Sequence, residues 1–152
     1  MLHFNFKLGN LIKLDKDTFK PSINLENNHG SIEICDIFEI KDDRLNFICL
    51  KPGTSGQSFS HLIAQARNSA MYLSNLNNTE ISKFINSQCA EKVDLTSKKI
   101  NIILGIIHNK INDTNNIDLS LFPIMSLISI YVLKKDLEQK NIELELLLIP
   151  SN

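Results

Sequence analysis

The sequence lacks a long apolar run and an excess of charge of either sign. Its longest apolar stretch, near residues 102–107, is too short to cross a bilayer, and its first residues hold no apolar core of a signal peptide. The formal net charge of −1 at pH 7 creates no global field toward nucleic acid or membrane. We therefore expect a cytoplasmic protein without a membrane partner, in which nucleic-acid binding would need a local basic patch.

Cysteine is scarce, and its spacing excludes the common zinc sites. Cys35, Cys49 and Cys89 lie far apart, with no CxxC or Cys/His pairing, and the four histidines show no metal-ligand spacing. Cys35 and Cys49 lie in strand-like runs, where cysteine usually packs as a small apolar side chain. We expect reduced thiols in the core.

Signature motifs of several enzyme classes are also absent. The chain has no GxxxxGK[ST] phosphate loop, no nucleophile elbow, no HExxH helix and no Gly-rich dinucleotide turn. Any activity must therefore rest on a less common arrangement of residues.

The chain does contain enough apolar sequence for one domain. Its 152 residues, 43% hydrophobic and 22% charged, fit a single globular unit covering residues 1–152. Periodicity predicts an α/β fold with a mixed central sheet in the order β-β-β-α-α-β-α-β. We expect strands at 11–15, 31–40, 44–51, 99–108 and 142–149, a loop at 16–30, and helices at 58–75, from 79 onward, and at 122–140.

Three local signals refine this prediction. KDD, at residues 41–43, joins the strands 31–40 and 44–51 into a hairpin. KINIILGIIH, at 99–108, is apolar at both parities, which predicts a central strand covered on both faces. Ser58 is the expected N-cap of the first helix, and Pro123 fits the first turn of the last.

The hairpin carries two charged candidates for a functional site. Alternation along the first strand places Asp36 on an apolar face with Ile34 and Phe38, so its carboxylate must be paired, hydrogen-bonded or metal-bound. Lys51 ends the second strand on the same face as Cys49. Two structural interpretations remain open, namely an aspartate that caps a loop and a lysine whose amine reaches water.

The loop after Lys51 is rich in hydrogen-bonding groups, contributed by Thr54, Ser55, Gly56 and Ser58. A helix N-terminus beside a lysine attracts anions, which predicts a phosphate-bearing ligand, although helix capping alone also explains the serines. His61 and Gln65 follow on a polar stripe of the helix. This stripe is either solvated or faces the end of the strand that carries Lys51.

The chain resembles the sporadically distributed bacterial protein family, an uncharacterised group. Four segments carry the resemblance in the same order, namely residues 31–38, 47–51, 55–65 and 120–149. The resemblance covers about residues 11–149, and its matched positions are 32–36, Lys51, 60–62 and Gln65. It implies a prokaryotic protein of antiphage defence or of mobile elements. Members are usually longer and match in their C-terminal part, so we expect any N-terminal activity to be lost or supplied by a partner.

The layout is also similar to the PD-(D/E)xK, or restriction-endonuclease-like, nuclease fold. There an Asp on one strand precedes (D/E)xK on the next strand and a helix that often carries a Gln. Asp36, Cys49-x-Lys51 and Gln65 match this layout, with Cys49 in place of the second carboxylate. The resemblance implies a catalytic set of Asp36, Lys51, His61 and Gln65, with Mg²⁺ or Mn²⁺ held by Asp36 to polarise a phosphate and activate water.

Three hypotheses for function follow. The first is a nuclease-like domain that binds nucleic acid and cleaves it with a divalent metal. The second is a non-catalytic protein-interaction or oligomerisation module, in which the polar residues are structural. The third is a sensor of a nucleotide or another small ligand. Lysines clustered beside the loop would favour nucleic acid, and a large exposed apolar patch would favour a protein partner.

Overall fold

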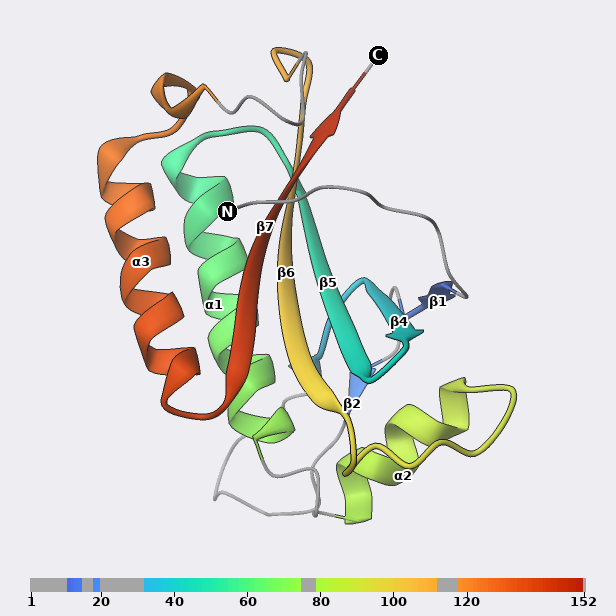
Figure 1. The fold of residues 1–152 in the computed structure, drawn as a ribbon. Helices are drawn as coiled ribbons and strands as arrows, with labels where there is room; N and C mark the ends of the chain where they lie inside the picture. The colour runs from blue at the N-terminus through green and yellow to red at the C-terminus, as the bar shows by residue number, and fades with distance from the viewer. Residues whose placement is uncertain (1–10, 15–17, 20–31, 75–78, 112–117, 152) are drawn as a thin grey trace, which may run out of the picture.

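The chain folds into a mixed β-sheet with α1 (Gly56–Leu73) and α3 (Ile124–Glu138) side by side on one face (Figure 1). The structure is a computed structural model that describes residues 11–14, 18–19, 32–74, 79–111 and 118–151. The main sheet has the strand order β1-β4-β5-β6-β7 within these residues. Its strands are β1 (Leu11–Lys13), β4 (Ile37–Lys41), β5 (Arg44–Pro52), β6 (Lys99–His108) and β7 (Ile142–Pro150).

Strand pairing in the sheet changes from antiparallel to parallel at β5. β1, β4 and β5 pair antiparallel, whereas β5, β6 and β7 pair parallel. The remaining described elements are β2 (Thr18–Phe19), β3 (Ile32–Glu33), α2 (Thr79–Gln88) and the 3₁₀ turn η1 (Leu119–Leu121). The predicted α/β class and mixed central sheet are confirmed.

The hairpin and the central strand form where the sequence predicts them. Lys41 faces Arg44 across a two-residue turn, and Asp42 adopts a φ of 52°, which aspartate tolerates better than most residues. β6 lies between β5 and β7, and its residues 101–106 are all buried. Because both of its faces are covered, this strand is apolar at both parities.

The predicted strand 31–40 is broken in the structure. β3 ends at Glu33 and β4 begins at Ile37, because the backbone of Asp36 bonds outside the regular ladder. Its N–H donates to the carbonyl of Ile48 at 3.0 Å, and its carbonyl accepts the N–H of Leu14 at 2.9 Å. The predicted loop 16–30 is wrong at residues 18–19, which form β2 against β3. Its other residues lie outside the described part of the chain.

Two helices also begin differently from the prediction. The N-cap of α1 is Ser55 rather than Ser58, because the Ser55 hydroxyl accepts the backbone N–H of Ser58 at 3.2 Å. Pro123 is the N-cap residue of α3 rather than a first-turn residue. The helices therefore run over 56–73 and 124–138 instead of 58–75 and 122–140.

The core lies between the sheet and α1. The predicted apolar stripe of α1 is buried, and its members are Phe59, Leu62, Ile63, Ala66, Ala70 and Leu73. In the sheet, the rings of Phe38 and Phe47 lie 5.0 Å apart between centroids. Phe59 meets Phe122 edge-on at 5.5 Å, which joins α1 to the segment that leads into α3.

Candidate functional site

The carboxyl ends of the parallel strands meet at one edge of the sheet. β5, β6 and β7 end there at Pro52, His108 and Pro150, and α1 and α3 both begin at the same edge (Figure 1). In open α/β sheets, ligands usually bind outside the carboxyl ends of the strands. Lys51, the last charged residue of β5, lies at this edge.

The loop from β5 to α1 holds Lys51 beside the first turn of the helix. The Ser58 hydroxyl donates to the carbonyl of Pro52 at 3.0 Å, and the N–H of Gly53 donates to the carbonyl of Ile107 at 2.8 Å. Gly53 has a φ of +85°, a conformation that favours glycine. Lys51 therefore lies next to the N-terminus of α1, as the short loop predicts.

The predicted ligand-binding hydroxyls take part in capping. The hydroxyl oxygens of Ser55 and Ser58 lie 3.1 Å apart, and both groups hold the loop together. Gly56 opens the helix and Thr54 is half-buried. The first N–H groups of α1, those of Gly56 and Gln57, have no acceptor within the helix and remain suited to an anion. Ligand binding by this loop stays a prediction.

Asp36 has a structural partner. Its Oδ2 atom accepts the backbone N–H of Leu50 at 2.7 Å, and the residue is half-buried rather than fully buried. The predicted hydrogen bond to the carboxylate is thereby confirmed, and the donor is the backbone. This bond lies just before β4 begins, opposite a part of β5 that β4 does not reach, so the side chain extends the pairing of β5.

Cys49 stands where the nuclease layout needs a second carboxylate. Burial raises the pKa of its thiol well above the usual range, and the charges of Asp36 and Glu33 raise it further, while Lys51 opposes them. The group is therefore a neutral thiol at physiological pH, and a thiol must lose its proton to bind a metal. Cys35 and Cys49 are buried free thiols, as predicted, whereas the free thiol Cys89 is only partly buried.

Within the described part of the chain, Asp36 does not belong to a larger cluster of metal-ligating side chains. Among the described residues, no group of three or more His, Cys, Asp or Glu side chains is placed to share a metal ion. Magnesium prefers several oxygen ligands, whereas Asp36 offers one carboxylate with an oxygen already hydrogen-bonded. Metal binding by Asp36 stays a prediction that a metal-dependent assay can test.

His61 and Gln65 lie one turn apart on α1. Helical spacing puts them near Ser58 and Ser69, and the Ser69 hydroxyl donates to the carbonyl of Ile34. His61 is exposed and Gln65 is half-buried. Ser69 thus contacts the segment before Asp36, Gln65 lies one helical turn before Ser69, and the catalytic role of His61 and Gln65 stays a prediction.

The comparisons with known proteins identify a family. A family model matches residues 3–150, nearly the whole chain, and its description is a family of unknown function, DUF6119. The chain belongs to the DUF6119 family. No curated protein and no solved structure matches it significantly. The expected membership of an uncharacterised family is confirmed, and the match carries no sign of the nuclease-like resemblance.

The other face of the sheet of this DUF6119 chain carries a row of polar side chains that sequence reasoning missed. Asn46 donates to Glu39 at 2.8 Å, and Asn101 donates to Asn46 and to Glu145 at 3.0 Å each. Glu39, Asn46 and Asn101 are all buried. The signal in the sequence is one asparagine inside each of two apolar strands. The row links β4, β5, β6 and β7, which points to a role in strand register.

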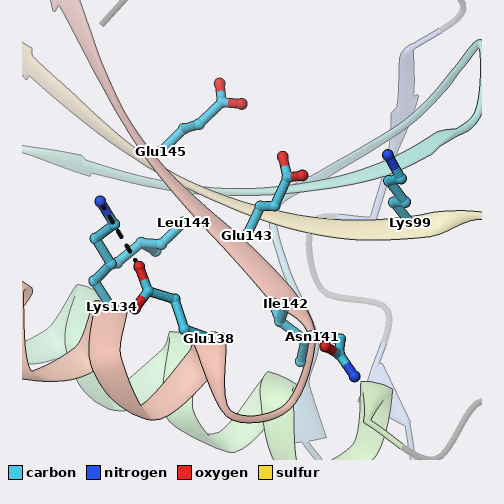
Figure 2. Close-up of a pocket in the computed structure, with 8 residues that line it drawn as sticks. All are labelled: Lys99, Lys134, Glu138, Asn141, Ile142, Glu143, Leu144 and Glu145. Carbon is cyan, nitrogen blue, oxygen red and sulfur yellow. Dashed lines mark ion pairs between the residues drawn. The ribbon is translucent and has the colours of Figure 1, made fainter. Parts of the chain in front are cut away.

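A surface pocket of about 480 Å³ lies near the starts of β6 and β7, at the opposite edge of the sheet from Lys51. Figure 2 shows the residues that line it. Among its lining residues are Lys99, Lys134, Glu138, Glu143 and Glu145. Its carboxylates already have cationic partners, since Arg44 lies 2.9 Å from Glu143 and Lys134 lies 3.9 Å from Glu138. Because the pocket lies near the starts of β6 and β7 and Lys51 lies near the end of β5, the pocket is separate from the predicted site.

One further observation concerns membranes. In the described part of the DUF6119 chain, no helix combines the length and the apolar character needed to cross a bilayer.

Proposed function

We propose that this DUF6119 domain binds a phosphate-bearing ligand, first of all a nucleic-acid strand, at the carboxyl edge of β5, β6 and β7. One observation carries the proposal. Lys51, the last charged residue of β5, lies beside the N-terminus of α1 and forms no ion pair with any residue that the structure describes. A lysine and a helix N-terminus together attract a phosphate.

The topology supports the same location. An antiparallel hairpin, a helix and a parallel strand follow one another, as in the nuclease-like layout, with Asp36 directly before β4, Lys51 on β5 and Gln65 on α1. This likeness is an analogy of layout and does not by itself establish an activity. The defence or mobile-element setting belongs to the same proposal and rests on the family resemblance. The cytoplasmic location also belongs to it and rests on the apolar and charge patterning of the sequence.

The proposal is binding without cleavage. A metal-dependent nuclease needs two or more oxygen ligands for its ion, and Cys49 contributes a neutral thiol instead. Asp36, Lys51, His61 and Gln65 would then position a phosphate backbone rather than hydrolyse it.

The test is a titration of labelled single- and double-stranded DNA and RNA at low and moderate salt. Affinity should fall steeply as salt rises, because bound phosphates release counterions. Lys51→Ala should weaken binding and lower the slope of log K against log salt by about 1, the loss of one phosphate contact. Lys83→Ala, an exposed lysine on α2, is the matched control and should leave both quantities unchanged.

The same samples, incubated with Mg²⁺ or Mn²⁺ and resolved on a gel, test cleavage. Intact nucleic acid supports a binding domain. Metal-dependent cleavage that disappears in Asp36→Asn would replace the proposal with an active nuclease. A folded protein that binds no nucleic acid at any salt concentration would refute the proposal and favour the protein-interaction module.

A further inference from the structure

His108 is the last residue of β6 and lies at the same edge of the sheet as Lys51. It is half-buried. Its carbonyl accepts the N–H of Ser151 at 3.3 Å, which holds it against the end of β7. On the other side, the carbonyl of Ile107 accepts the N–H of Gly53 at 2.8 Å. The loop that follows Lys51 therefore runs beside the end of β6 that carries His108.

The side chains of His108 and Lys51 belong to the same face of the sheet. Lys51 pairs with Ile106 in the parallel register, and His108 follows Ile106 by two positions. Ile106 lies in the buried core with Phe59 of α1, so this is the face that the helices cover (Figure 1). Because residues two apart on a strand share a face, His108 and Lys51 are diagonal neighbours on adjacent strands. Two basic residues thus flank the point where β5 turns into α1.

A hydrogen bond of the His108 ring determines which of its nitrogens carries the proton. Nδ1 accepts the backbone N–H of Lys110 at 3.0 Å. A ring nitrogen that accepts a hydrogen bond holds no proton, so the proton of the neutral imidazole is on Nε2. Among the residues that the structure describes, Nε2 has no hydrogen-bond partner. The ring therefore offers one N–H donor in an orientation that the turn fixes.

We propose that His108 is a further phosphate-binding residue of the carboxyl-edge site, whose Nε2–H donates to an oxygen of the phosphate that Lys51 attracts. The inference rests on the proposed function and adds a residue to it. Lysine binds phosphate as a flexible point charge, whereas a ring held through its other nitrogen directs its donor. A hydrogen bond to a charged acceptor is stronger than one between neutral groups.

His108→Asn separates phosphate binding from the turn that His108 closes. An asparagine oxygen accepts the N–H two positions along the chain, as Nδ1 of His108 does for Lys110, so the turn is kept. The donor at the far end of the ring is lost. This variant should unfold at the same temperature as the unmodified protein and bind labelled single-stranded DNA and RNA about tenfold more weakly, the loss of one hydrogen bond to a charged group.

The salt dependence of binding distinguishes His108 from Lys51. A neutral donor displaces no counterion, so at about pH 8, which disfavours a second ring proton, His108→Asn should leave the slope of log K against log salt unchanged. Lys51→Ala should lower that slope by about 1. A residue that serves only the turn would leave both the affinity and the slope of the asparagine variant unaltered. That result overturns the inference, while a Lys51→Ala effect would leave the proposed function standing.

Heteronuclear NMR of the imidazole nitrogens observes the contact itself. The His108 signals, assigned by their absence in His108→Asn, should show the Nε2–H tautomer, and the Nε2 signal should move when inorganic phosphate is added. Lys51→Ala should raise the phosphate concentration that this change requires. An Nε2 signal that phosphate does not move overturns the inference. If phosphate moves it but neither DNA nor RNA binds, His108 keeps its role and the nucleic-acid part of the proposed function fails.

Discussion

The carboxylate of Asp36 accepts the backbone N–H of Leu50 at 2.7 Å. β4 begins only at Ile37, whereas β5 runs on to Pro52, so the N–H of Leu50 meets a side chain where a longer strand would offer a carbonyl. The residue that the nuclease-like layout marks as a metal ligand thus also completes the sheet. Its variants must be interpreted with both roles in view.

Removing this carboxylate should destabilise the fold. Asp36→Ala leaves the N–H of Leu50 without its acceptor and should lower the free energy of unfolding by about 1–3 kcal/mol. Asp36→Asn keeps an oxygen at the same place and should lose less. Urea unfolding of both variants provides the measurement. Equal stability of Asp36→Ala and the unmodified protein would show that water replaces the bond without cost.

The buried Asn46 and Asn101 should stabilise the fold through one connected set of hydrogen bonds. Asn46→Ala removes the donor to Glu39 and the acceptor of Asn101, which should lower the free energy of unfolding by about 1–3 kcal/mol. The double variant with Asn101→Ala should lose less than the sum of the single variants, because the two residues share a hydrogen bond.

The exposed Asn68 of α1 is the control for this cycle, and Asn68→Ala should change stability by less than about 0.5 kcal/mol. Strict additivity of Asn46→Ala and Asn101→Ala in urea unfolding would contradict a connected row.

Ionisation of the Cys49 thiol in the unfolded chain should lower the free energy of unfolding at alkaline pH. Burial raises the pKa of this thiol in the native state, so above about pH 8.5 the unfolded chain loses a proton that the native state keeps. The native state then binds more protons, and the free energy of unfolding falls by about 1.4 kcal/mol per pH unit for this one group. Below that pH both states are protonated and the group contributes no pH dependence.

Cys49→Ala isolates this contribution. The difference in unfolding free energy between the unmodified protein and the variant should stay constant up to about pH 8.5 and shrink above it. Urea unfolding at a series of pH values measures it. A difference that is the same at every pH would mean that the thiol ionises freely in the native state.

Substitution of Gly53, whose backbone is left-handed, should destabilise the protein. Gly53→Ala forces a Cβ into a φ of +85° and should cost about 1–2 kcal/mol. Gly56→Ala is the matched control, because a Cβ there meets nothing within 4 Å and the residue begins a helix. That variant should be neutral or slightly stabilising in thermal unfolding. A harmless Gly53→Ala would show that the loop beside Lys51 can rearrange.

Much of the architecture could be predicted from the sequence, because helix and strand periodicity are local. The double parity of KINIILGIIH predicted β6 and its central place, and the apolar stripe of α1 is buried as its spacing requires. The sequence also showed an aspartate on an apolar strand face and a lysine before a loop that caps a helix. It led to Asp36 and Lys51 as candidates, whose function remains to be measured.

The tertiary structure decided what depends on contacts between distant segments. Only the pairing of β4 with β5 shows that Asp36 serves Leu50, and only the register across four strands brings Asn46 and Asn101 together, 55 positions apart. Likewise, the apolar sequence of α3 predicted a helix but not which of its sides the fold would leave open. Hydrogen-bond partners and covered faces are properties of the packed chain, and a linear pattern does not contain them.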